Sequence, residues 1–172
     1  MGTIRVNGST SGYVELAAPA VAGSVVMTLP ATTGTVAVQG EAYGRSATAT
    51  VATSQTTTSA SYTDLATAGP AVTVTTGTKA FVITSARISG SALGFDSYQS
   101  YAVSGATTVV ASDTVAIMHG AFRVNTSMRA SAGQMITGLT AGSNTFTTKY
   151  RVDSTSTGTF LDRTITVIDM GS

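Results

Sequence analysis

The chain has 172 residues, with 9 Lys and Arg against 8 Asp and Glu, a formal net charge of +1, and no cysteine or tryptophan. These values exclude two full-size domains, a disulfide scaffold and a thiolate zinc site. The even charge balance also argues against a nucleic-acid partner, which needs clustered cations. Thr, Ala, Ser and Gly supply 96 of the 172 residues, and 42% of the chain is hydrophobic, which is enough for a packed domain. The composition favours a β-rich structural or binding protein.

The first predicted unit, residues 1–40, is a short β segment with strands expected at 3–6, 13–16, 24–29 and 35–38. Burying one Val or Leu stabilises a fold by about 1.5–3 kcal/mol, whereas ordering each residue costs about 1–2 kcal/mol of backbone entropy. Because the segment has few large side chains, we expect it to anchor the protein or to trimerise by packing on copies of itself. The apolar residues expected to make this contact are Val14, Leu16, Val25, Met27 and Leu29.

The N-terminal region contains no predicted targeting or membrane segment. Arg5 and Glu15 lie within residues 1–15, which hold no apolar core of signal-peptide length. The uncharged run 16–40 is interrupted by Pro19, Pro30 and many polar residues, so it lacks the continuous apolar stretch of a spanning helix. We expect synthesis in the cytoplasm of the producing cell without a signal peptide, and no membrane partner.

Residues 41–46 are the predicted hinge, and residues 47–172 are the predicted head domain. In the head, polar and apolar residues alternate, and Gly, Pro, Ser and Asp mark a turn about every eight to twelve residues. In 145–152, Phe146 and Tyr150 fall on one face and the cations on the other. This pattern predicts an all-β fold, a jelly-roll-like antiparallel β-sandwich. Its strands are expected at 47–58, 71–75, 79–89, 98–104, 114–118, 131–137, 145–152 and 163–170.

The predicted strand 79–89 is apolar on both faces. Phe81 and Ile83 point one way, while Val82 and Ile88 point the other. A strand in a two-sheet sandwich has only solvent on its second face, unless another subunit covers it. We therefore expect Phe81 and Ile83 to pack between head domains of different chains.

Two stretches resemble a pattern found in virion proteins of tailed bacteriophages. Residues 9–38 contain strands separated by the motifs APAVAG (18–23) and LPATTG (29–34), and residues 138–168 resemble the end of the β-sandwich heads that follow. In that group the N-terminal pattern trimerises decoration proteins, head fibres and tail fibres or attaches them to the virion. The sequence has no repeated shaft, so the resemblance implies a short decoration protein or head-fibre knob more than a long receptor-binding fibre.

The sequence predicts no catalytic, cofactor or metal site. A serine hydrolase needs a nucleophile, a base and an orienting residue, but the only histidine, His119, is expected at the surface at the end of a strand. The eight Asp and Glu are scattered singly, unlike the paired carboxylates of a glycosidase or the oxygens of a calcium loop. Metal binding is left open only where one Asp from each of three chains converges on a symmetry axis. Surface ion pairs are expected among Lys149, Arg151, Asp162 and Arg163.

Three aromatic residues, Phe95, Tyr98 and Tyr101, lie close together in the sequence near a glycine turn. Tyr98 and Tyr101 are the candidate ligand contacts, because aromatic rings can stack on a sugar or on a partner protein. The alternative is packing in the core or at an interface, since aromatic residues in a strand pattern often form one packed face.

These features predict a non-enzymatic structural protein on the surface of a phage virion. It would be a trimeric capsid decoration protein or head fibre that binds and stabilises the capsid. The alternative is a tail fibre or adhesin head that binds host-surface glycans or a receptor through Tyr98 and Tyr101. An enzyme such as a depolymerase is the third hypothesis, and it would depend on His119 and on single Asp residues.

Overall fold

The computed structural model describes residues 3–7, 13–17, 45–120, 123–153 and 156–171. The chain divides into two compact units, Met1–Val36 and Ala37–Ser172. In the first unit, β1 (Thr3–Asn7) and β2 (Tyr13–Ala17) form an antiparallel hairpin. The strands expected at 3–6 and 13–16 are therefore confirmed. The expected strands 24–29 and 35–38, with Val25, Met27 and Leu29, and residues 41–44 of the expected hinge lie outside the described residues.

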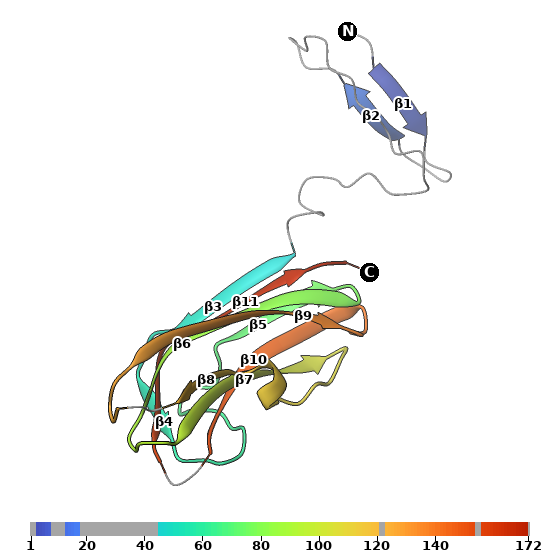
Figure 1. Ribbon diagram of the computed structural model, residues 1–172. Helices are drawn as coiled ribbons and strands as arrows, with labels where there is room; N and C mark the ends of the chain where they lie inside the picture. The colour runs from blue at the N-terminus through green and yellow to red at the C-terminus, as the bar shows by residue number, and fades with distance from the viewer. Residues whose placement is uncertain (1–2, 8–12, 18–44, 121–122, 154–155, 172) are drawn as a thin grey trace. The chain divides into compact units, whose positions relative to one another are not determined.

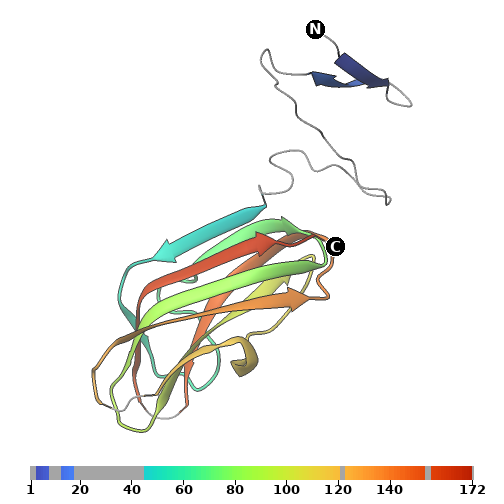
Figure 2. The same cartoon turned by 45° about the horizontal axis from the view of Figure 1, so that its top comes forward.

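The second unit is a sandwich of two antiparallel sheets, which confirms the predicted all-β fold (Figure 1). The five-stranded sheet has the order β3-β11-β6-β9, with β4 paired to β11, and Figure 2 shows its four long strands side by side. The four-stranded sheet has the order β5-β10-β7-β8. Early strands pair with late ones in both sheets, β3 with β11 and β5 with β10, as in a jelly roll. The strands are β3 (Ser46–Val51), β4 (Gln55–Thr57), β5 (Ala71–Thr76), β6 (Lys79–Gly90), β7 (Asp96–Gly105), β8 (Ile117–Gly120), β9 (Met128–Thr137), β10 (Gly142–Val152) and β11 (Gly158–Asp169).

Most of these strands begin and end close to where the alternating pattern predicts them. The predicted strand 114–118 is wrong in its first half, because a single 3-10 turn, η1 (Asp113–Val115), precedes β8 there. The predicted strand 47–58 is two strands, β3 and β4, separated by a bend. In the described part of the chain no helix is long and apolar enough to cross a membrane.

Alternating side chains fill the space between the two sheets. Val82 and Ile88 point inward and are buried, whereas Phe81 and Ile83 lie on the outer face of the five-stranded sheet. One half of the interior is apolar and holds Val72, Val74, Val82, Val103, Phe146, Ile165 and Val167. The other half holds a second apolar cluster around Tyr150 and Phe160, whose rings lie 4.8 Å apart, together with several buried polar side chains.

The expectation that Arg163 makes a surface ion pair is wrong, because its side chain is 0% exposed. The ladder between β11 and β6 changes register between Leu161 and Thr164, which marks a β-bulge. Asp162 adopts a φ of 51° at this point, in the left-handed region that Asp tolerates better than most residues. The extra residue reverses the alternation, so Arg163 points into the sandwich and Asp162 stays at the surface.

Candidate functional site

The outer face of the five-stranded sheet carries an apolar surface that we call the Phe81 patch. Phe81 lies opposite Met135 of β9 on one side and opposite Ile168 of β11 on the other, and Ile83 follows two residues along β6. Met135 is 43% exposed and Ile168 is 37% exposed, while Phe81 and Ile83 are half-buried. The Phe81 patch is made of Phe81, Ile83, Met135 and Ile168.

A glycine lets the Phe81 patch lie flat on the sheet. A Cβ atom added to Gly133 would come within 2.8 Å of Cζ of Phe81 and 3.7 Å of Cγ1 of Ile83. The Phe81 ring therefore lies over the backbone of β9, where any other residue would displace it. Gly133 and Met135 are two residues apart and both face outward on β9. The alternation in 131–137 therefore already indicates that they lie on the same face, although only Phe81 and Ile83 were predicted to be interface residues.

The opposite end of the same outer face is polar and rich in cations. Next to the Phe81 patch, Thr166 lies opposite Ile83, and its hydroxyl is 2.9 Å from that of Thr48 on β3. Beyond them, Arg87 and Arg129 each lie 3.9 Å from the same carboxylate, that of Asp162. Asp162 does form a surface ion pair, but its partners are these arginines of β6 and β9 and not the expected Lys149, Arg151 or Arg163. Two cations share one anion here, so the N-terminal end of β9 carries a net positive charge.

On the outer face of the four-stranded sheet, Arg151 is the centre of a group that we call the Arg151 cluster. Its Nε and Nη2 atoms donate to the two carboxylate oxygens of Asp113 over 2.9 and 2.5 Å. Its guanidinium lies 3.9 Å from the ring centroid of Tyr98 and 5.6 Å from that of Tyr62. The Tyr62 hydroxyl donates to Asp113 Oδ1 over 2.8 Å. The cluster consists of Tyr62, Tyr98, Asp113 and Arg151 and ties β10 to η1.

Charges within the Arg151 cluster shift the ionisation of its members. The hydrogen bond from Arg151, together with that from Tyr62, lowers the pKa of the Asp113 carboxyl below its usual range. Burial, followed by the hydrogen bond to Asp113, raises the pKa of the Tyr62 hydroxyl. At neutral pH the cluster therefore holds a carboxylate, a guanidinium and the two neutral phenols of Tyr62 and Tyr98. Lys149 of the same strand pairs with Asp64 at 2.7 Å. Lys149 and Arg151 therefore both form surface ion pairs, but with Asp64 and Asp113 in place of the expected Asp162.

The structure does not bring Tyr98 and Tyr101 together as one stacking platform. The two residues lie on opposite faces of β7, since Tyr98 faces outward under Arg151 and Tyr101 faces inward. Tyr101 is 3% exposed and its ring lies 6.2 Å from that of Phe146 in the core. Residues three apart in a strand point to opposite faces of the sheet, so the alternation of the strand alone argues against a surface shared by Tyr98 and Tyr101.

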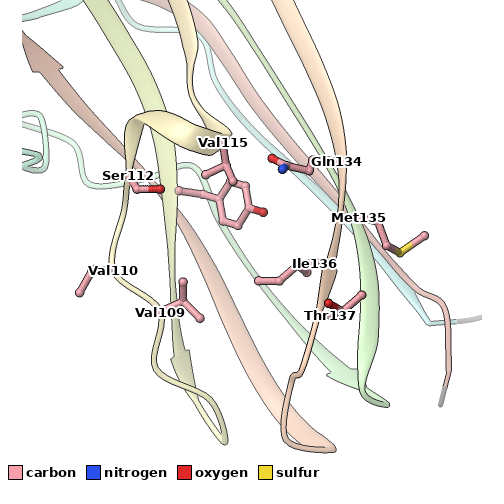
Figure 3. A pocket seen from close by; sticks show the side chains of 9 residues that line it. Val109, Val110, Ser112, Val115, Gln134, Met135, Ile136 and Thr137 are labelled. Atoms are coloured by element: carbon pink, nitrogen blue, oxygen red, sulfur yellow. The ribbon is translucent and has the colours of Figure 1, made fainter.

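Tyr101 instead lines a cavity of about 240 Å³ at the margin of the sandwich, between β9 and residues 109–115 (Figure 3). In this view Gln134 and Ile136 of β9 point toward Val109 and Val115 across the cavity, and Met135 points away to the outer face. We call this space the edge cavity. Its lining residues are Tyr101, Val109, Val110, Ser112, Val115, Gln134, Met135, Ile136 and Thr137.

The expectation that His119 lies at the surface is wrong. His119 is 7% exposed and lies on the inner side of β8, directly opposite Ser97 of β7 in the ladder. Neither imidazole nitrogen of His119 has a hydrogen-bond partner among the described residues, and the same holds for Ser97 Oγ and Ser156 Oγ. No hydrogen bond joins Ser97 to His119 among the described residues.

Among the described residues, no group of three or more His, Cys, Asp and Glu side chains lies close enough together to hold a metal ion. The Asp162 carboxylate is already paired with two arginines, each 3.9 Å away. The candidate functional surfaces are therefore the Phe81 patch, the Arg151 cluster and the edge cavity. Comparison with known protein families and with curated proteins finds no match to this chain.

Proposed function

We propose that this chain is a non-enzymatic structural protein of a tailed-phage virion. In this proposal it is a trimeric decoration protein or head fibre that binds the capsid surface and stabilises it. The observation that carries the proposal is the Phe81 patch. It places four large apolar side chains on the outer face of a sheet, where they contact solvent unless another subunit covers them. Phe81 and Ile83 would pack against a neighbouring head domain.

Two further features support the proposal. The jelly-roll arrangement of the head is one that viral capsid domains and lectins both use, which is an argument by analogy of fold. The hairpin β1–β2 lies in a compact unit of its own, and its register sets Val14 opposite Val6 and Leu16 opposite Ile4. Two such strands with a short hydrophobic set are marginal alone and gain stability by association.

The mechanism of stabilisation would be linkage. A protein that binds only the assembled shell stabilises that shell by its binding free energy. Three linked anchors bind with avidity, so each contact can be weak while the trimer stays attached. Val14, Leu16, Val25, Met27 and Leu29 are the residues proposed for the anchor contact.

Electron microscopy of particles that carry a gold-labelled copy of the full chain tests the location. Label distributed over the capsid supports the proposal, and label confined to the tail overturns it. Light scattering of the full chain tests the trimer, which a stable monomer at micromolar concentration would contradict. The double variant Phe81→Thr, Ile83→Thr should weaken association, whereas the control Met118→Thr, which removes an exposed apolar side chain from the other sheet, should not.

The second candidate function is a tail fibre or adhesin head that binds host-surface glycans. The specific observation in its favour is the Arg151 cluster, in which Tyr98 and Tyr62 lie beside a guanidinium and a carboxylate. Sugar sites commonly combine aromatic faces with such groups. A glycan array probed with the full chain separates the two functions, since binding that Tyr98→Ala abolishes supports the adhesin and the absence of binding supports the decoration protein.

A further inference from the structure

β9 is an open edge of the five-stranded sheet. All ten of its residues pair with β6 on one side, and no strand in the described part of the chain pairs with its other side. Natural proteins protect such edges with proline, charged residues or bulges. β9 contains no proline and no Asp or Glu, its ladder with β6 has no register shift, and its one charge is Arg129 at the start. The free backbone N–H and C=O groups of β9 therefore suit a further strand.

The edge cavity lies directly beside the second half of this edge. Its walls are apolar, with Val109 and Val115 facing Ile136, and the Tyr101 and Gln134 side chains reach it as polar groups. Val110 at its margin is 78% exposed. A space of about 240 Å³ is smaller than a drug-sized pocket and suits a single bulky side chain. Burying such a side chain stabilises a complex and gives it sequence preference.

The first half of β9 adds a charge preference. Arg87 and Arg129 share the single carboxylate of Asp162, each at 3.9 Å, and both arginine side chains are about half exposed. A strand that pairs along β9 and carries a carboxylate at this end would supply the second anion. Arg129 occupies an outer-facing position of β9, whereas Gln134 and Ile136 face the cavity.

We propose that the free edge of β9 and the edge cavity together bind an extended peptide segment of a partner protein as an added strand. A bulky apolar side chain of that segment fills the edge cavity, and a carboxylate side chain faces Arg129. Residues that lie opposite each other in a ladder point to the same side of the sheet. Arg129 points to the outer side, whereas Gln134 and Ile136 point to the cavity side, five and seven residues further along β9. The carboxylate and the apolar side chain of the ligand are therefore expected to be about five or seven residues apart, an odd spacing that places them on opposite sides.

In the antiparallel register centred on Gly133, a second copy of this chain fits the site less well than a partner peptide. Two β9 strands paired about Gly133 would set Ala132 and Ala130 of one copy opposite Gln134 and Ile136 of the other. These methyl groups are too small to fill the edge cavity. The inference concerns the head domain alone and does not depend on the proposed virion role, so either can fail without the other.

The test uses the full chain, labelled with 15N, and synthetic nine-residue Thr-rich peptides. One peptide carries Glu at position 2 and Phe at position 7, and a second carries the same pair in reverse order to cover the opposite strand direction. A third peptide, with Glu and Phe six residues apart, is the matched control because it sends both side chains to one side. We expect one of the first two peptides to slow hydrogen exchange of the β9 amides, and the control peptide to bind about tenfold more weakly.

Two variants of the chain separate the site from the surface in general. Val110→Asp places an anion at the mouth of the edge cavity, and Val124→Asp makes the same change at another exposed position. Val109→Phe fills the cavity without adding charge. We expect Val110→Asp and Val109→Phe to weaken peptide binding about tenfold or more and Val124→Asp to leave it within about twofold. Thermal unfolding of each variant checks that it is folded.

Three outcomes would overturn the inference. Peptide binding that protects β8 or β5 amides in place of those of β9 would move the site elsewhere. Equal binding of all three peptides would remove the geometric relation between the edge cavity and Arg129. Protection of β9 amides that rises with chain concentration in the absence of peptide, together with a dimer in sedimentation, would make a second copy the occupant.

Discussion

The two halves of the sandwich interior are filled in different ways. The half around Phe146 and Val103 is apolar, and its buried amide, Asn144, is bonded on both sides: Nδ2 donates to Thr76 Oγ1 and to Thr140 O, and Oδ1 accepts from Thr107 N. The half around Tyr150 and Phe160 contains a buried guanidinium and several polar atoms without partners among the described residues. Those polar residues are Ser97, Gln99, His119, Ser156 and Arg163.

The difference teaches which part of the core the strand pattern alone determines. In the apolar half, regular alternation on β5, β6 and β10 brings one side of each strand inward. In the polar half, the bulge in β11 turns Arg163 inward, where its Nη2 atom donates to Gln55 Oε1 over 2.9 Å. No carboxylate pairs with it among the described residues, and its guanidinium lies 5.3 Å from the Tyr150 ring. The buried charge of Arg163 is therefore stabilised by carbonyl oxygens, those of the Gly69 and Thr53 backbone and of the Gln55 side chain.

The largest effect is expected from the apolar half. Phe146→Ala removes a ring that is fully buried and packed beside Tyr101, and the surrounding strands cannot close the space it leaves. We expect the free energy of unfolding to fall by about 3–5 kcal/mol in urea titration. A loss below about 2 kcal/mol would show that this half relaxes around a cavity and is less tightly packed than its burial implies.

Arg163→Ala tests the polar half in the same way. The substitution removes a buried side chain that bonds to Gly69 O, Thr53 O and Gln55 Oε1, and we expect a loss of about 3 kcal/mol. Arg163→Met should lose less, because the apolar stem still packs. The exposed residue Arg129 is the matched control, and Arg129→Ala should change stability by about 0.5 kcal/mol or less. Equal losses for Arg163 and Arg129 would contradict a structural role for the buried guanidinium.

A pair of polar deletions compares bonded with unbonded groups directly. Asn144→Ala breaks a buried network and leaves partners unpaired, so a loss of about 2 kcal/mol is expected. Ser97→Ala removes a buried hydroxyl that has no partner among the described residues, so the change should stay within about 0.5 kcal/mol or be stabilising. Chemical denaturation of both variants measures the difference, and a costly Ser97→Ala would mean that a water molecule bonds to this hydroxyl.

The smallest effect belongs to the surface, and it depends on pH. Arg151 lowers the pKa of Asp113 in the folded chain, so the pair stabilises the fold above the ordinary carboxyl pKa of about 3.9. This stabilisation is lost as the pH falls through the lowered value. The difference in urea midpoint between the natural chain and Asp113→Asn should therefore be largest near neutral pH, shrink in acid, and decrease with added salt. A difference that grows on acidification would contradict the assignment.

Much of the fold follows from the sequence because strand alternation is a local property. The segments 79–89 and 145–152 give both the strand and its inward side correctly, and they are also the best-buried strands. Two of the errors fall where a local irregularity interrupts the strand pattern. The bulge at Asp162 places Arg163 inside, and the 3-10 turn at Asp113 shortens the strand that carries His119.

The candidate surfaces were harder to predict than the strands. The Phe81 patch needs the register of three strands, although Phe81 and Ile83 themselves follow from alternation. Arg151 and Asp113 are 38 residues apart in the chain, and no periodic pattern links them. The edge cavity depends on residues 109–115, which follow no strand or helix period, so the sequence gives no local signal for it.

The position of β11 between β3 and β6 has a consequence for how the protein is made. Of the nine strands in the sandwich, β11 leaves the ribosome last, yet β3, β4 and β6 each form hydrogen bonds with it in the folded sheet. During translation, the nascent chain contains strands whose backbone N–H and C=O groups are still unpaired, and such intermediates are prone to aggregate. The five-stranded sheet is therefore expected to be completed only after β11 has left the ribosome. Folding is also expected to be slow, as for other architectures dominated by pairings between distant segments.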